Sequence, residues 1–217
     1  MYEGAKGLCY FDLVRSRSAT LAILVALGAA PLAASISLTP HGAEAATSIE
    51  LSMSDLVTGS TLVVAGTPLD SRSLWEGDAS NHGRRIVTYT RLRVDRLIDG
   101  APQAEVWVRT LGGDVDDIGQ QVAGEAVLRV AQPSLLFLRG RPDGTHVVVG
   151  MGQGQYLLDA RPENGGARVR SPLEAGHLVT KAGGSGVAQR TARLTLVGRT
   201  LDEVAQLVAA ERRAHAP

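Results

Sequence analysis

The pattern of apolar and polar residues from 84 to 117 predicts a β-hairpin at the centre of the chain. Apolar and polar residues alternate, Asp99-Gly100 marks a turn, and the alternation resumes until Gly112-Gly113. Because successive side chains of a strand point to opposite faces, Val106 and Val108 share one face of the second arm. β-branched and aromatic residues are frequent in both arms, which favours strands over helices.

The first arm of this hairpin contains a change of parity. Val87 and Tyr89 share one face, whereas Leu92 and Val94 share the other. A change of face within one strand requires an extra residue, so we expect a β-bulge near Thr90-Arg91. A long, bent strand of this kind is typical of a barrel or a strongly curled sheet, because closure requires a bend.

Shorter apolar runs predict further strands on both sides of the hairpin. Turns that contain glycine or proline separate them, which favours antiparallel neighbours over helical crossovers. The polar segment 71–84 is predicted to be a loop. The flanking strands are predicted at residues 61–70, 134–139, 145–150, 155–159, 167–170 and 193–197.

Two capping boxes predict helices, one before the first strand and one at the end of the chain. Ser52 with Asp55, and Thr200 with Glu203, have the spacing at which each side chain bonds the other residue's backbone N–H. The second helix carries an apolar face that needs a surface to cover it. The predicted fold is therefore mainly β: a single antiparallel barrel-like or sandwich domain with a short N-terminal helix and an amphipathic C-terminal helix.

The first 45 residues have the layout of a secretory signal peptide. Arg15 and Arg17 precede an uninterrupted apolar run, and Ala43-Glu44-Ala45 supplies the small residues of a cleavage site. The alternative is an uncleaved membrane anchor, since about 20 apolar residues can span a bilayer. We expect cleavage near Ala45.

The remainder of the chain divides into three predicted parts. Residues 46–174 form the barrel-like domain. Residues 175–192 are rich in glycine, serine and threonine and are predicted to be a flexible loop or linker. Residues 193–217 comprise a short strand and the C-terminal helix, which packs on the domain.

Charge and cysteine content limit the possible cellular compartments and binding partners of the protein. The 217 residues carry 22 basic and 22 acidic side chains, so the formal net charge is zero and no nucleic-acid partner is predicted. The single cysteine, Cys9, precedes the apolar run, so removal of the leader leaves neither a disulfide nor a thiolate metal site. We expect an extracytoplasmic protein, periplasmic or secreted, that meets the membrane only through an uncleaved leader.

Several short motifs follow one another along the chain: a VVAG strand, a tryptophan, an I-x-T-Y-T strand, a double glycine, an apolar strand and a G-Q-G-Q-Y segment. They lie at Val63–Gly66, Trp75, Ile86–Thr90, Gly112-Gly113, Leu135–Leu138 and Gly152–Tyr156. In this order they resemble an uncharacterised family of secreted bacterial β-rich domains, some of which occur beside metalloprotease or cell-surface modules. The resemblance implies a β-rich exported domain and brings no catalytic residues with it; the chain has no H-E-x-x-H motif.

Asp114, Asp116 and Asp117 are the candidate metal ligands, with Glu125 nearby. Ca²⁺ takes six to eight oxygen ligands, and carboxylates in one loop can supply several of them. The D-x-D-D spacing lacks the loop glycine and the distal glutamate of an EF-hand, so a solvated acidic loop is the competing interpretation. No other cofactor is predicted.

Trp75, Tyr89 and Trp107 are the candidate ligand-surface residues, because aromatic side chains combine a large area with a flat face. Packing within the domain is the competing interpretation. The resulting hypothesis is a non-catalytic secreted module that binds a protein, envelope or glycan partner. The alternative is an extracytoplasmic metal-dependent hydrolase, or a Ca²⁺-binding protein, that uses the Asp114–Asp117 loop.

Overall fold

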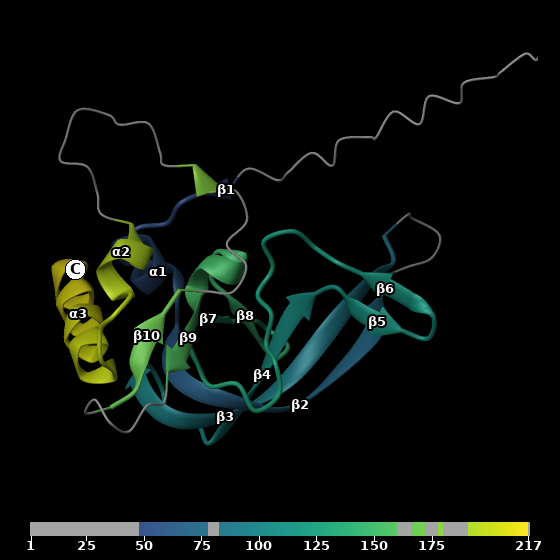
Figure 1. The fold of residues 1–217 in the computed structure, drawn as a ribbon, viewed down its shortest axis with the longest axis horizontal. Helices are drawn as coiled ribbons and strands as arrows, with labels where there is room; N and C mark the ends of the chain where they lie inside the picture. Colours follow the sequence, from purple (N-terminus) through teal and green to yellow (C-terminus); the bar gives the residue numbers. More distant parts are fainter. Residues whose placement is uncertain (1–47, 78–82, 160–165, 172–177, 180–190, 217) are drawn as a thin grey trace, which may run out of the picture. The chain divides into compact units, whose positions relative to one another are not determined.

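A computed structural model describes residues 48–77, 83–159, 166–171, 178–179 and 191–216 (Figure 1). The chain divides into two compact units, residues 1–42 and 43–217, and every described residue belongs to the second. The predicted signal peptide and its cleavage site lie outside the described residues. None of the helices in the described part has the length and apolar character that a membrane crossing requires.

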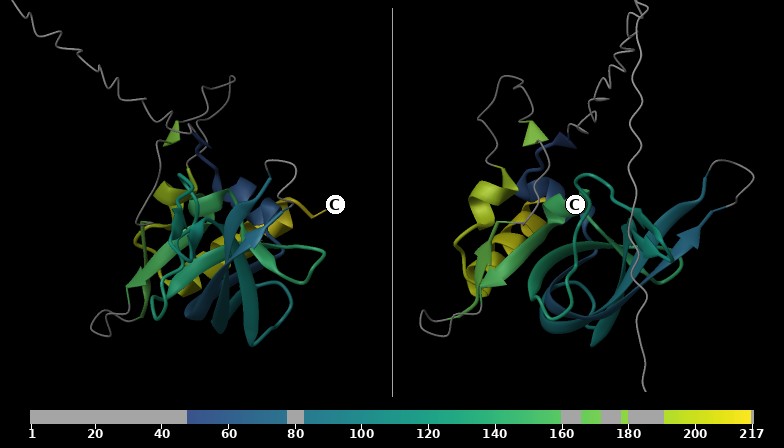
Figure 2. Two further views of the ribbon diagram at one scale, coloured as in Figure 1. Left: turned by 90° about the vertical axis from the view of Figure 1, so that its right-hand side faces the viewer. Right: turned by 45° about the vertical axis from the view of Figure 1, so that its right-hand side comes forward.

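Five strands close into a barrel (Figure 1, Figure 2). β2 (Leu62–Glu76) pairs with β3 (Arg85–Asp99), and β3 pairs with β4 (Glu105–Leu111). β7 (Ser134–Gly140) lies on the other edge of β2, and β8 (His146–Val148) joins β4 to β7. The β4–β8 pair is parallel and the other four pairs are antiparallel. The prediction of a mainly β, barrel-like chain is confirmed.

The seam that closes the barrel is short. β7 pairs with β8 over three residues, whereas β4 and β8 meet at the single pair Val108 and His146. The same edge of β7 also binds β9 (Gln155–Asp159), which pairs with the first half of β7, while β8 pairs with its second half. β10 (Arg168–Arg170) extends this sheet beyond β9.

The remaining short elements connect or flank the barrel strands. β5 and β6 form a hairpin after β4, and η2 is a single 3₁₀ turn between β8 and β9. β1 and β11 form a separate parallel pair. Their bounds are β1 (Ser48–Ile49), β5 (Gly113–Val115), β6 (Ile118–Gln120), η2 (Met151–Gly154) and β11 (Leu178–Val179).

Aliphatic side chains from all five barrel strands fill the barrel interior. Because side chains alternate along a strand, neighbouring residues of β2 and β7 face a second core on the outside of the barrel. Both faces of these strands are thus covered, which explains their unbroken apolar runs. The interior set comprises Leu62, Val64, Leu92, Val106, Val108, Ala126, Leu136, Leu138 and Val148.

The second core lies between the outer surface of the barrel and three helices, α1 (Met53–Gly59), α2 (Ala192–Leu196) and α3 (Leu201–Ala214). All three helices lie on one side of the barrel (Figure 1). Phe137 and Tyr156 meet edge to face in this core, with ring centroids 6.4 Å apart. The strand residues of this core are Val63, Leu135, Phe137, Tyr156 and Val169, and the helix residues are Met53, Leu56, Val57, Ala192, Leu196, Val204 and Val208.

Two predictions about the long strands are wrong. Residues 71–76, predicted to be a loop, form the second half of β2. β3 has no extra residue near Thr90-Arg91, because it pairs with β4 without a shift from Val87 to Arg93; the irregularity beside Arg91 lies in the partner strand β2. The register of β2 against β3 shifts instead between Pro68 and Asp70 and at two further points nearer the start of β2.

The predicted strand at 193–197 is also wrong, because these residues belong largely to α2. The Thr191 side chain accepts a hydrogen bond from the backbone N–H of Leu194, which caps this helix. Most of the predicted linker 175–192 lies outside the described residues. Within it, Leu178–Val179 form β11.

Candidate functional site

The pairing of β2, β3 and β4 sorts their side chains into two faces. Residues directly opposite each other in an antiparallel pair share a face. On the interior face, Ser73 lies opposite Thr88, which lies opposite Thr110. On the outer face the corresponding row, one residue away, contains Tyr89 and Arg109.

Trp107 is the exposed aromatic residue of the outer face. Its side chain is on β4, opposite Arg91 of β3, and 44% of the residue's surface is exposed. The Arg91 guanidinium donates hydrogen bonds of 2.9 and 2.6 Å to Asp70 and lies 3.5 Å from a Glu105 carboxylate oxygen. The outer face therefore presents a flat indole beside a guanidinium that two carboxylates hold in place.

The other arginines beside Trp107 on β3 and β4 are also paired with carboxylates. Nε of Arg93 lies 2.7 Å from Oδ1 of Asp95. Arg109 binds Glu76, and this hydrogen bond is the main reason why the pKa of the Glu76 carboxyl is lowered. Positive charge on this part of the face is thus largely neutralised within the protein.

Tyr89 shares the outer face with Trp107, but its hydroxyl is already engaged. It donates a hydrogen bond to Glu76, and this bond raises the pKa of the tyrosine hydroxyl. The Tyr89 hydroxyl therefore orients Glu76, and it is the ring that remains for contact with a ligand.

Trp75 does not join these two residues. It pairs with Ile86 and so lies on the opposite face of the β2–β3 ribbon, where the Arg84 guanidinium sits 4.8 Å from its ring centroid. Two of the three predicted aromatic residues thus share a surface, and the third packs under an arginine.

The predicted metal ligands lie on the β5–β6 hairpin. Asp114 is on β5, while Asp116, with a φ of 53°, and Asp117 form the turn. Aspartate tolerates this left-handed conformation better than most residues, which gives the turn a structural explanation. In the described part of the chain no group of three His, Cys, Asp or Glu side chains could hold a metal ion. The calcium hypothesis stays a prediction, which a titration of the melting temperature would test.

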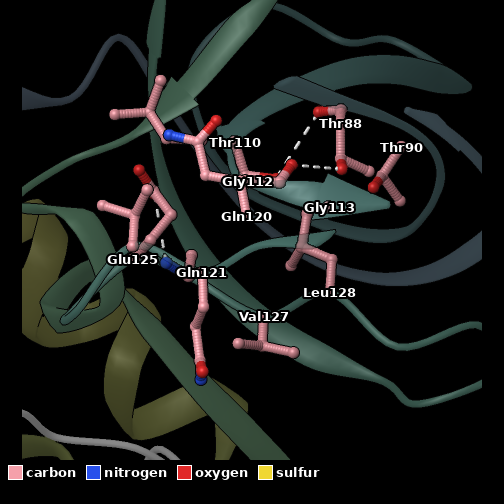
Figure 3. A pocket seen from close by; sticks show the side chains of 13 residues that line it. Thr88, Thr90, Thr110, Gly112, Gly113, Gln120, Gln121, Glu125, Val127 and Leu128 are labelled. Carbon is pink, nitrogen blue, oxygen red and sulfur yellow. Dashed lines mark hydrogen bonds between the residues drawn. The ribbon is translucent and has the colours of Figure 1, made fainter. Parts of the chain in front are cut away.

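A pocket of about 190 Å³ opens at one end of the barrel interior (Figure 3). We call it the mouth pocket. Thr88 and Thr90 lie on one side of it, and Glu125 and Gln121 lie across from them (Figure 3). Its lining residues are Thr88, Thr90, Thr110, Leu111, Gly112, Gly113, Gln120, Gln121, Val122, Glu125, Ala126, Val127 and Leu128.

Glu125 is the ionisable residue of this lining. Burial raises the pKa of its carboxyl, against the opposing effect of the Ala126 and Leu111 backbone N–H groups and of the Arg109 charge. The N–H of Ala126 lies 3.1 Å from Oε1 of Glu125. The sequence offered no local sign of this site, because Glu125 meets the threonines only through long-range folding.

The segment that carries Glu125 is held against the barrel by hydrogen bonds. The Gln155 side chain accepts from the Val127 N–H at 2.9 Å and donates to the Val127 carbonyl at 2.7 Å. The N–H of Gly152 donates to the Gly124 carbonyl at 2.7 Å. These bonds fix the wall of the mouth pocket opposite the threonines.

Comparison of the chain with protein-family models, with curated proteins and with solved structures finds no match. The resemblance to secreted bacterial β-rich domains therefore stays a prediction.

Proposed function

We propose that this chain is an extracytoplasmic, non-catalytic binding module that holds an oligosaccharide of the cell envelope on the outer face of β3 and β4. The observation that carries the proposal is the exposed indole of Trp107 on a rigid barrel strand. A flat aromatic face packs well against the apolar face of a sugar ring. The proposed location rests on the leader-like sequence of residues 1–45.

The surroundings of Trp107 favour a sugar over a nucleic acid. An oligonucleotide is held mainly by unpaired cationic side chains that neutralise its phosphates. Here Arg91 and Arg93 are paired with carboxylates on the same face. Fixed guanidinium and carboxylate groups beside an aromatic ring instead suit the hydroxyl groups of a neutral sugar.

The barrel architecture is consistent with this choice. Five-stranded Greek-key barrels of the OB type bind oligonucleotides and oligosaccharides on the face of their second and third strands. In the present barrel the second and third strands are β3 and β4. This is an analogy of architecture, and the side chains around Trp107 carry the argument.

The test uses the fact that the chain has two tryptophans, Trp75 and Trp107. In the variant Trp75→Phe, the fluorescence reports on Trp107 alone. We expect soluble oligosaccharides of β-linked N-acetylglucosamine or β-linked glucose to shift its emission to the blue, and calorimetry to detect the binding.

Trp107→Ala should weaken this binding by about tenfold or more, as loss of an aromatic anchor typically costs over ~1.4 kcal/mol. Trp75→Phe should leave the affinity unchanged. Binding that survives in Trp107→Ala, or the absence of any binding across both sugar series, would refute the proposal. N-terminal sequencing of the exported protein tests the proposed location, with Ala46 expected as its first residue.

A further inference from the structure

The mouth pocket lies inside the barrel, on the side of β3 and β4 that faces away from Trp107. Thr88, Thr90 and Thr110 continue the interior face that Leu92, Val106 and Val108 form deeper in the barrel. At this end hydroxyl groups replace aliphatic side chains.

The Thr90 hydroxyl gives the first sign of a ligand. Thr90 is 1% exposed and lines the pocket. The Thr88 hydroxyl donates a hydrogen bond of 2.7 Å to the Gly112 carbonyl oxygen, and the Thr110 hydroxyl donates one of 3.4 Å to the Thr88 carbonyl oxygen. The Thr90 hydroxyl, by contrast, makes no hydrogen bond to another residue in the described stretches. Because this hydroxyl faces the pocket, it can donate to or accept from a molecule bound there.

Glu125 gives the second sign. Its carboxyl is bonded by backbone N–H groups but forms no ion pair with a described side chain. Burial of a carboxylate is costly unless a positive charge compensates it. The charge of Arg109 compensates this cost only in part, because the pKa of Glu125 is still raised. No lysine, arginine or histidine is among the residues that line the pocket.

The size of the pocket and the apolar part of its lining limit the ligand further. A volume of about 190 Å³ equals ~6 water molecules at ~30 Å³ each. It is smaller than the ~300–1,000 Å³ of sites for drug-sized molecules. Aliphatic Val122, Val127 and Leu128 also line the pocket. A single ring that carries hydroxyl groups and also has an apolar face would match this mixed lining.

We infer that the mouth pocket binds a small hydroxylated organic cation of the size of one amino-sugar ring. The ammonium group of the ligand pairs with Glu125, and its hydroxyl groups bond Thr90 and the neighbouring threonines. This site is separate from the outer face around Trp107 and does not depend on the function proposed there.

The probe is glucosamine, which is cationic at neutral pH, and its matched control is glucose, which has the same ring without the charge. Calorimetric titration of the full mature chain should show glucosamine binding at least tenfold more tightly than glucose. Glu125→Gln, which keeps the shape of the side chain, should abolish this preference. Thr90→Val, of nearly the same shape, should weaken glucosamine binding by about threefold to tenfold, the cost of one net hydrogen bond.

Two control variants separate this site from the outer face. Glu105→Gln and Trp107→Ala should both leave glucosamine binding unchanged, and thermal melts should show that every variant is folded. The inference is overturned if glucosamine does not bind, if glucose binds equally well, or if folded Glu125→Gln binds glucosamine as tightly as the original chain. Loss of oligosaccharide binding in Trp107→Ala concerns the outer face, so it tests the proposed function and not the mouth pocket.

Discussion

Arg109 of β4 and Glu76 at the end of β2 form an ion pair across the outer face of the barrel, although β3 lies between their strands. Nε of Arg109 is 3.1 Å from Oε2 of Glu76, and the arginine side chain is only 8% exposed. Tyr89 of the intervening strand donates its hydroxyl to the same carboxylate. One cluster, with Arg109 buried and Glu76 and Tyr89 half-buried, thus joins three consecutive strands.

Removal of Arg109 should destabilise the protein. In Arg109→Met the aliphatic part of the side chain is kept, but Glu76 loses its counter-charge in a partly buried position. We expect the free energy of unfolding in denaturant to fall by roughly 1–3 kcal/mol. The control is Arg93→Met, whose ion pair with Asp95 is largely exposed and should contribute ~1 kcal/mol or less. Equal effects of the two substitutions would contradict this ranking.

Glu125→Gln should raise the stability of the ligand-free protein at neutral pH. Burial raises the pKa of Glu125, so the folded state binds a proton more readily than the unfolded state. The contribution of this group to stability is fully present below the unfolded pKa, near 4.5, and is lost as the pH rises through the folded pKa. The gain in the free energy of unfolding should therefore be present at pH 7 and vanish near pH 4. A variant less stable than the original chain at pH 7 would contradict it.

His146 should make the barrel sensitive to mild acid. The residue is 8% exposed, its Nδ1 has no hydrogen-bond partner among the described residues, and burial lowers the pKa of its imidazole. The unfolded chain therefore takes up the proton first, and stability falls as the pH drops below about 6.5. The difference in the free energy of unfolding between pH 7.5 and pH 5.5 should be smaller in His146→Gln. An equal difference in both proteins would show that His146 does not titrate in this way.

Gly113→Ala should be among the most damaging single substitutions. The residue has a φ of 127°, and an added Cβ would collide with the hydroxyl oxygens of Thr88 and Ser73. We expect a loss of ~2–5 kcal/mol in the free energy of unfolding, from backbone strain and overpacking together. The matched control is Gly124→Ala, which also has a positive φ but no atom near the added Cβ, and should lose only ~1–2 kcal/mol. Similar losses for both would mean that the Thr88–Ser73 contact yields easily.

The strands with a simple apolar pattern could be predicted from the sequence. β4 places Val106 and Val108 inside the barrel and exposes Trp107, as its alternation indicates. β7 is buried from Ser134 to Leu138 because cores lie on both of its faces. In these elements the local pattern and the tertiary environment agree.

The errors lie where the barrel interior is not apolar. Along β3 the interior positions at the barrel end are Thr88 and Thr90, and apolar Val87 faces outward. The parity of the apolar residues therefore suggested a bulge that the strand does not have. Ser71 and Ser73 of β2 occupy the matching positions, so this part of the strand has the composition of a loop.

The mouth pocket could not be predicted for a related reason. Glu125 follows Gly124 in a segment without periodicity, and its neighbours in space come from β3 and β4. The sequence of segment 193–197 predicts a strand, but five alternating residues suit either a strand or one helical turn. The cap at Thr191 and the burial of Leu196 in the second core stabilise the helix.

Because β4 and β8 pair only at Val108 and His146, the barrel is closed by one short contact and not by a continuous ladder of hydrogen bonds. Releasing the three residues of β8 would uncurl the sheet while the ladders of β2 with β3, β3 with β4 and β2 with β7 stay intact. Such a partial opening requires far less free energy than global denaturation, so backbone amides along this seam should exchange with solvent deuterium earliest among the barrel strands. During folding, the pairing of β8 with β4 and β7 should form last, after the longer ladders have brought β4 and β7 close together.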